Sequence, residues 1–310
     1  MGLTPCLFDK PAALGSRQLM QTLRPQIYAY LLLLPAFIFL VGFTHYPALA
    51  TLFDSLMSTP RGARPAVFVG LDNYQGMIED PIFWKSLVNN FWFALATIPI
   101  SIALSITMAL WVNDKMIGRQ FLRMSYFLPT VLPMIAVANI WIFFYTPGYG
   151  LINQVLQAFG FASQNWLGDP TLVLGSVTVV AIWKEAGFFM IFYLAALQGL
   201  SPSYKEAAAL EGASSWYFFR RIQWPLLMPT TIFVLVNALI NAFRMVDHII
   251  VMTKGGPDNA SSLLLFYLYE VGFKFWDQGY ASALTAVLLA LLAFVGLLQF
   301  FVLDRRTHYR

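Results

Sequence analysis

The side chains of this chain that could do chemistry are a few polar and charged groups set in long apolar stretches. In the stretch 226–250, four polar residues recur at steps of four, three and four, so that one face of a helix carries Asn237, Asn241, Arg244 and His248. A second group, Trp183, Lys184 and Glu185, interrupts the apolar stretch 170–198 near its middle. Charged groups at bilayer depth are costly and normally face a protein interior or an aqueous cavity.

These groups allow two interpretations, interhelical bonding or a path for a polar solute. Asn237 and Asn241 could bond to a neighbouring helix, and Asp247 is three residues from Arg244, a spacing that favours an ion pair. A polar solute can be bound by stacking aromatic rings together with amide and carboxylate groups. The candidate path residues are therefore Trp183, Glu185, Asn237, Asn241 and Arg244. A stripe of small residues, Thr97, Ser101 and Ser105, favours close helix packing instead.

The usual catalytic and metal-binding patterns are missing from the sequence. His45, His248 and His308 are too scattered to form a metal cluster, and there is no HExxH. No nucleophile–base arrangement can be read, and no GxxxxGK[ST] phosphate loop occurs. The single cysteine, Cys6, cannot form an internal disulfide. We expect no enzyme activity, no catalytic residue, no metal and no cofactor in this chain.

The composition identifies the elements that must position the polar groups. Of 310 residues, 59% are hydrophobic and 11% are charged, whereas an average soluble domain has about 25% charged residues. A membrane-spanning helix needs about 20 apolar residues. The sequence predicts an all-α polytopic membrane protein with six helices, at about 27–50, 88–112, 124–146, 170–198, 226–250 and 279–303. Together they form a transmembrane domain over 27–303, between tails at 1–26 and 304–310, with 147–169 as an exposed polar loop.

The distribution of Lys and Arg predicts the orientation. With the N-terminus inside, most of these residues fall on the tails and on the loops that follow the second and fourth helices. Positive residues favour the cytoplasmic side. Both termini are therefore expected in the cytoplasm.

The loop at 201–225, between the fourth and fifth predicted helices, has the signals of two short helices. Ser203 and Glu206 have capping-box spacing, and Pro202 suits a helix start. Gly212 can take the left-handed backbone that ends a helix. The first short helix is therefore expected to end at that glycine.

A second short helix is predicted from Ser214 or Ser215 to a point before Pro225. It would carry an apolar stripe at three-residue steps, formed by Trp216, Phe219 and Ile222. Such a pair of helices either lies on the membrane and neighbouring helix ends or docks into a groove of a soluble partner.

The loop carries a resemblance to a known motif. The loop contains Glu206-Ala207-Ala208, then Gly212 after three residues, Ile222 after nine more, and Trp224-Pro225 after one more. This pattern resembles the EAA motif of permease subunits of binding-protein-dependent ABC importers. That family usually has Leu-Pro where this chain has Trp224-Pro225. Weaker matches are Val69 to Tyr74, Phe127-Leu128-Pro129 and Thr253 to Pro257. Jointly they resemble the sugar permeases of the maltose and glycerol-3-phosphate type.

The resemblance implies a mechanism and partners. The EAA loop would insert into a cleft of a separate ATPase, which carries ATP and Mg, and ATP-driven closure would switch the permease between inward and outward access. The implied ATPase-coupling residues are Glu206, Ala207, Ala208, Gly212, Ile222 and Pro225. The family places solute contacts on the helix before Gly-Gly-Pro, which favours Asn237 and Asn241 as path residues. The implied partners are a second permease subunit, usually a different chain, two ATPase copies and an external solute-binding protein, with membrane lipid around the helices.

A secondary transporter is the rival interpretation, and the substrate stays open. Lys184-Glu185 could serve as the proton relay of an ion-coupled secondary transporter, but six helices and a partner-binding loop fit that class poorly. A neutral sugar is favoured over glycerol phosphate or its diesters, because Glu185 and Asp247 can neutralise Lys184 and Arg244. No nucleic-acid partner is expected, because the basic residues form no basic face.

Overall fold

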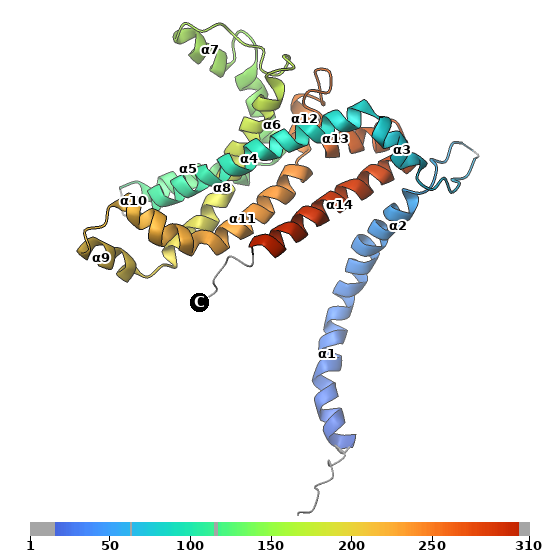
Figure 1. Ribbon diagram of the computed structural model, residues 1–310, viewed down its shortest axis with the longest axis horizontal. Coiled ribbons are helices and arrows are strands. Elements are labelled where there is room, and N and C mark those ends of the chain that lie inside the picture. Colours follow the sequence, from blue (N-terminus) through green and yellow to red (C-terminus); the bar gives the residue numbers. More distant parts are fainter. Residues whose placement is uncertain (1–15, 63, 115–116, 304–310) are drawn as a thin grey trace, which may run out of the picture. The chain divides into compact units, whose positions relative to one another are not determined.

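The computed structural model of this chain describes residues 16–62, 64–114 and 117–303, with side chains from Tyr28 to Gln299 (Figure 1). The predicted tail 304–310, and the predicted tail 1–26 as far as residue 15, lie outside the described residues. The chain divides into two compact units, residues 1–53 and 54–310, which we describe separately.

The first unit is one long helical segment. It comprises α1 (Ser16–Leu40), the π-helical turn η1 (Val41–His45) and α2 (Tyr46–Asp54). Pro47 has no N–H to continue regular bonding, and just before it the N–H of Tyr46 donates to the carbonyl of Val41, five residues earlier. The part long and apolar enough to cross a membrane is Tyr28–Asp54. The helix therefore extends beyond the predicted bounds of 27–50 at both ends.

Helices make up most of the described residues of the second unit. Its elements are α3 (Asp72–Glu79), α4 (Pro81–Asn113), α5 (Arg119–Val131), α6 (Met134–Tyr145), α7 (Leu151–Ala158), α8 (Val173–Gln198), α9 (Pro202–Leu210), α10 (Ser215–Phe218), η2 (Phe219–Gln223), α11 (Trp224–Arg244), α12 (Asp247–Met252), α13 (Leu264–Tyr269), η3 (Glu270–Lys274) and α14 (Gln278–Leu303). Across the described chain five helices are long and apolar enough to span a membrane, or six when α5 and α6 count as one bent span.

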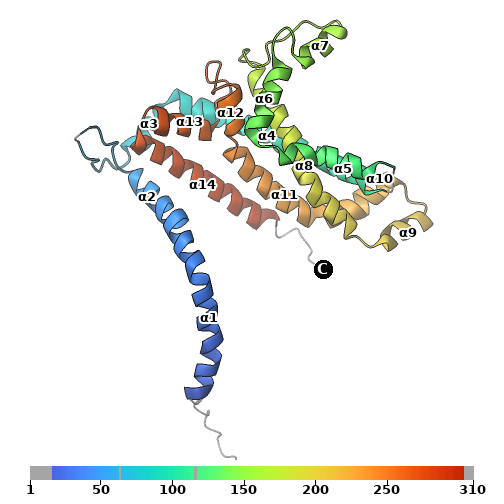
Figure 2. The same cartoon turned by 180° about the vertical axis from the view of Figure 1, so that it is seen from behind.

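The centre of the second unit is the pair α4 and α8, which pack along each other. The predicted small-residue stripe of α4 is buried, with Thr97 at 4% and Ser101 and Ser105 at 0% exposure. Figures 1 and 2 show α9 and α10 at one end of this pair and α3 and α13 toward the other. α4 contacts α3 and α13 at one end, and its other end lies beside the elements that follow α8.

The third predicted helix, 124–146, is not continuous. It consists of α5 and α6, which meet at an angle of 103°. Leu132 is extended, with ψ at 137°, because the ring of Pro133 disfavours the helical conformation in the residue before it. The break therefore follows from a proline whose effect the prediction did not include.

The predicted exposed loop at 147–169 also departs from expectation. It contains the helix α7, whose Asn153 is fully buried. The Asn153 side chain donates to the Gln164 carbonyl at 3.0 Å and accepts from the Trp166 ring N–H at 3.1 Å. These bonds explain how a polar residue in this segment can be internal.

The fifth predicted helix, 226–250, has different ends and an interruption. Helical structure runs from Ser215 through η2 into α11, so Pro225 does not end the second short helix. The Trp224 N–H donates to the Phe219 carbonyl, and Pro225 then lies in the first turn of α11, where its missing N–H costs nothing. α11 ends at Arg244, and α12 begins at Asp247.

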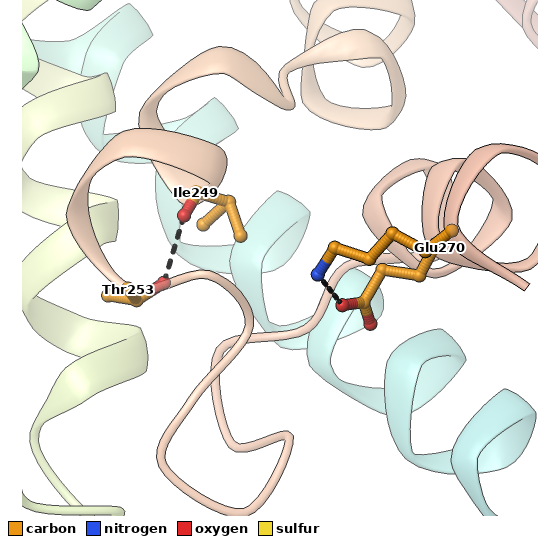
Figure 3. A network of polar contacts seen from close by, with 4 residues as sticks. Ile249, Thr253 and Glu270 are labelled. Carbon is orange, nitrogen blue, oxygen red and sulfur yellow. Dashed lines mark hydrogen bonds and ion pairs between the residues drawn. The ribbon is translucent and has the colours of Figure 1, made fainter.

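The N-terminal part of α4 holds the loop that follows α12. Asn89 donates to the carbonyls of Asn259 and Ser262, and the Ser86 and Ser262 hydroxyls are 3.0 Å apart. Figure 3 shows the start of this loop, where the Thr253 hydroxyl donates to the Ile249 carbonyl at 3.3 Å. It also shows the ion pair between Glu270 and Lys274 in η3. The loop containing Thr253 to Pro257 is therefore fixed to α4.

Asp80 ties the start of α4 to α13 and α14. Its carboxylate accepts hydrogen bonds from the Tyr267 and Tyr280 hydroxyls and, as the N-cap of α4, from the Ile82 N–H. Burial alone would raise the pKa of Asp80, but these hydrogen bonds outweigh burial and hold the pKa below its ordinary value. Asp80 therefore stays ionised and keeps its three acceptor bonds.

The contact of α5 with α8 predicts the effect of Gly187→Ala. A Cβ at Gly187 would lie 2.1 Å from the Tyr126 carbonyl oxygen, so the two helices would have to separate. We expect a loss of about 1–3 kcal/mol in the free energy of unfolding, as for other overpacked cores. An SDS titration of the detergent-solubilised chain measures it.

The matched control is Gly175→Ala in the same helix, where a Cβ would meet nothing within 4 Å. Alanine favours helix over glycine, so this variant should be at least as stable as the original chain. Equal stability of the two variants would contradict the close α5–α8 contact.

Candidate transport and coupling sites

A polar cavity of about 280 Å³ lies where three interrupted or polar helix segments meet. It is bounded by the start of α6, the middle of α8 and the break between α11 and α12, and is lined by Met134, Lys184, Glu185, Asn241, Arg244, Met245, Asp247 and His248. The structure thus brings together three of the five predicted path residues, Glu185, Asn241 and Arg244.

Lys184 holds the broken end of α5. Its Nζ donates to the carbonyl oxygens of Pro129, Thr130 and Leu132 at 3.0, 3.4 and 2.5 Å. The last carbonyls of a helix have no partner within the helix and carry partial negative charge, which a cation stabilises. Lys184 is therefore a cap for α5 at the cavity wall, a role that its position in an apolar stretch did not indicate.

Glu185 and Asn241 connect α8 to α11 across the cavity. Glu185 is only 7% exposed, and its Oε2 accepts a hydrogen bond from the Asn241 Nδ2 at 3.0 Å. The two interpretations of Asn241 therefore coexist, since it bonds to a neighbouring helix and also lines the cavity.

The other two predicted path residues lie elsewhere. Asn237 donates to the Phe233 carbonyl of its own helix at 2.7 Å and does not line the cavity. Trp183 is 41% exposed and packs edge-on against Trp141, with ring centroids 5.7 Å apart. Asn237 and Asn241 share a face of α11, as their spacing predicts, but only Asn241 is far enough along the helix to line the cavity.

The charged and aromatic groups near the helix break differ from expectation in two ways. No ion pair joins Arg244 to Asp247 in the described part of the chain, because α11 ends between them and their helical spacing is lost. His248 is fully buried and stacks on Phe93, with ring centroids 5.8 Å apart. The exposed Arg244 guanidinium therefore faces the cavity without a carboxylate partner.

The loop after α8 forms two short helices at an angle, an elbow that comprises α9, α10 and the turn between them. The N-cap of α9 is Ser201, whose hydroxyl accepts from the Ser203 N–H, so the predicted capping box of Ser203 and Glu206 is wrong. Pro202 takes the first helical position, so the N-cap is the residue before this proline, Ser201, and not Ser203.

Gly212 ends α9 as predicted. Its φ is +69°, and the Ala213 N–H donates to the Ala208 carbonyl at 2.9 Å while the Gly212 N–H donates to the Ala209 carbonyl at 3.1 Å. This pair of bonds is a Schellman motif. The next helix starts as predicted, because the Ser214 hydroxyl caps α10 by accepting from the Tyr217 N–H at 3.2 Å.

The elbow packs against the C-terminal end of α4. Lys205 Nζ lies 2.8 Å from Asp114 Oδ1, and Ala208 is buried at 8% exposure. On the other side Glu206, Ala207 and Gly212 are exposed.

The remaining predicted coupling residues also lie in or just after the elbow. Ile222, in η2, is half-buried, and Pro225, at the start of α11, is exposed. Next to Gly212, Leu210 is 91% exposed, an apolar residue that the motif does not include. A free surface of small and apolar residues thus projects from the end of the α4–α8 pair.

Comparison with known proteins identifies the family. Residues 82–309 match the model of the binding-protein-dependent transport system inner membrane component. This chain belongs to that family. The permease is therefore a multi-pass inner-membrane component of a transport system.

Several relatives resemble the permease over most of its length. It is 33% identical to the sulfoquinovosyl glycerol transport system permease of Agrobacterium fabrum, over 86% of this chain and 87% of that protein. It is 33% identical to the trehalose/maltose transport system permease of Thermococcus litoralis, over 87% and 90%. It is 30% identical to the sn-glycerol-3-phosphate transport system permease of Agrobacterium fabrum, over 92% and 97%.

The fold is also found in solved structures. A chain of a bacterial alginate ABC transporter, in complex with an alginate pentasaccharide-bound periplasmic protein, matches with a TM-score of 0.82 at 22% identity. The match covers 94% of this chain and 98% of that one. The predicted all-α polytopic fold class is therefore confirmed, with five or six candidate spans and a pair of short helices after α8.

The cap on α5 predicts the effect of Lys184→Met. Methionine keeps the length of the side chain but leaves three carbonyl oxygens without their donor, and hydrogen bonds to a charged group contribute about 1.5–3 kcal/mol. We expect a loss of stability of that order in SDS titration, with partial recovery in Lys184→Arg.

Lys254→Met is the control, since Lys254 is exposed and carries no side-chain hydrogen bond or ion pair in the described structure. If Lys184→Met and Lys254→Met unfolded alike, Lys184 would not hold the bend.

Proposed function

We propose that this permease is a subunit of an ATP-driven importer that moves a sugar or a related polyol or glycoside across the cytoplasmic membrane by alternating access. The observation that carries the proposal is the elbow, which projects from the end of the central helix pair with Glu206, Ala207 and Gly212 exposed. The relatives named for trehalose/maltose and sulfoquinovosyl glycerol transport support the substrate class.

In this proposal the elbow contacts a separate ATPase, which holds ATP and Mg. Alanines permit two surfaces to approach closely, and the sharp turn at Gly212 presents the end of α9 as a convex tip. The full set of coupling residues is Glu206, Ala207, Ala208, Gly212, Ile222 and Pro225. Ala208 would act by seating α9 on the permease, because it is buried in this chain.

The remaining partners follow the family pattern. A second permease subunit, two ATPase copies and an external solute-binding protein would complete the transporter, and the periplasmic protein in the alginate transporter complex supports the last of these. The elbow would then lie in the cytoplasm with both termini, in agreement with the distribution of Lys and Arg.

The solute would contact the polar cavity through Glu185, Asn241 and Arg244. Glu185 and Asn241 offer the carboxylate and amide groups that bind sugar hydroxyls. A glycerol-3-phosphate-type substrate is the second candidate, because Arg244 faces the cavity without a carboxylate partner and a guanidinium binds phosphate well. The third candidate function is an ion-coupled secondary transporter. It differs from an ATP-driven importer in its energy source, an ion gradient instead of ATP.

The turn of the elbow predicts how substitutions at Gly212 affect coupling. Nothing lies within 4 Å of a Cβ at this position, so only the positive φ limits the residue type. Valine is strongly disfavoured at positive φ, whereas asparagine tolerates it. We expect Gly212→Val to lose ATP-driven uptake and to release the ATPase on purification, and Gly212→Asn to retain most of both.

Uptake into vesicles given ATP and an ionophore measures this prediction. Uptake that stops when the ion gradient is collapsed despite ATP would contradict ATP coupling and favour the secondary transporter. Equal uptake by the valine and asparagine variants would contradict the role of the elbow.

The cavity predicts different effects for two asparagines one turn apart in α11. Asn241→Leu removes the amide that faces the cavity, and we expect the maximal uptake rate to fall about tenfold, equivalent to about 1.4 kcal/mol. Asn237→Leu is the matched control and should transport normally, because Asn237 bonds within its own helix outside the cavity. Equal rates in both would show that the solute does not contact this cavity.

Arg244→Gln then separates the two substrate classes. Uptake of a neutral sugar should survive the loss of the guanidinium. Uptake of a phosphate ester should not.

A further inference from the structure

An apolar groove of about 660 Å³ lies between α4 and the helix that continues from the elbow into α11. One wall consists of Ile102, Ala103 and Ile106 of α4, and the other of Trp216, Phe219 and Trp224. The three aromatic rings form a row, with centroids 5.6 Å apart for the first pair and 6.2 Å for the second. Trp216 belongs to α10 of the elbow, but none of these six residues is among the path or coupling residues proposed above.

The depth of the groove corresponds to one leaflet of a bilayer. It follows α4 from Ile98 to Thr107, and α4 ends at Asn113 beside the elbow. At 1.5 Å per residue the groove therefore extends from about 9 to about 22 Å below that end of the helix. A leaflet contributes half of the hydrocarbon thickness of about 30 Å. The groove is therefore about as long as one leaflet of the hydrocarbon core is thick.

The mouth of the groove is positively charged. Arg220 lines it and is exposed, and in the described structure its guanidinium has no hydrogen bond or ion pair. Trp216 lies beside it with 67% exposure, and tryptophan is enriched where a membrane meets water. Apolar walls with a cation at the mouth match an acyl chain attached to an anionic headgroup.

A protein helix would suit the groove less well. It would have to supply an acidic group beside Arg220, or else leave that cation buried and unpaired. A phospholipid carries its phosphate beside its acyl chains, so the phosphate could pair with Arg220 while an acyl chain occupies the groove. Basic pockets between transmembrane helices at a membrane face bind anionic headgroups in the same way.

We propose that this groove binds an anionic phospholipid, with an acyl chain between α4 and α11 and the phosphate on Arg220. Arg221 is adjacent and also exposed, but it does not line the groove. The site is therefore specific to one of two neighbouring arginines.

Photolabelling of the full-length chain in nanodiscs tests the proposal. The discs contain phosphatidylcholine and a small fraction of phosphatidylglycerol with a diazirine on its acyl chain. We expect label on peptides covering 98–107 and 216–224, and displacement by unlabelled phosphatidylglycerol but not by phosphatidylcholine. A basic residue near an anionic lipid contributes about 1 kcal/mol, so Arg220→Gln should reduce the yield about fivefold.

Two matched controls accompany that variant. Arg221→Gln removes the same charge outside the groove and should label like the original chain. Ala103→Trp fills the groove and should abolish labelling, whereas Leu104→Trp, at the next exposed position outside the groove, should not.

Three outcomes would overturn the proposal. They are equal yields from Arg220→Gln and Arg221→Gln, equal competition by phosphatidylcholine, and capture of another polypeptide by a photoreactive residue at position 103 in native membranes. Because a nanodisc presents the same lipids on both faces and contains no ATPase, the result does not depend on the orientation or on the coupling proposed above.

Discussion

The bond between the Lys184 ammonium and the carbonyl end of α5 is the interaction on which the interior of this permease depends. Within hydrocarbon every backbone polar group needs a partner, and a broken helix leaves carbonyls without one. Pro133 breaks the third span, and Lys184 supplies donors to three of the carbonyls at the break. The bend of 103°, and with it the cavity wall formed by Met134, can therefore exist at membrane depth.

A second break is satisfied in a similar way. α11 ends at Arg244, and the carbonyl of Ala242 in its last turn accepts a hydrogen bond from the buried Asn90 of α4 at 3.4 Å. Asn90 also accepts from the Leu264 N–H. The two interrupted spans thus take their missing partners from α4 and α8, the two uninterrupted helices at the centre. Polar side chains of a rigid pair cap the irregular helices, and the cavity lies between the capped ends.

Much of this arrangement follows from the sequence, because local signals determine it. Gly212 and Ser214 set the turn of the elbow by backbone preference and capping, which act over a few residues, and both were predicted. The apolar stretches gave the number of spans. The breaks at Leu132–Pro133 and after Arg244 were missed, because hydropathy is continuous across them and the cost of a break depends on donors from other helices. Lys184 could have been recognised only by knowing that Pro129 lies beside it.

The same distinction explains the candidate path residues. Asn237 and Asn241 share a helix face, and sequence periodicity treats them alike. Only Asn241 reaches Glu185 of α8 and the cavity, because that choice is made by the packing of α11 against α8 and by where α11 ends. The predicted pairing of Arg244 with Asp247 failed for the same reason, since it assumed a helix that continues through both residues.

The ion pair between Lys205 and Asp114 contributes little to holding the elbow on α4. The two side chains are 70% and 69% exposed, and exposed ion pairs add little to stability. The caps fix the internal angle of the elbow, and Ala208 is the buried residue of α9. In the proposed mechanism, such a rigid elbow would transmit the motion of the ATPase to α4. α4 itself reaches from beside the elbow to the loop at Asn259 and Ser262, and carries the Asn90 that caps α11.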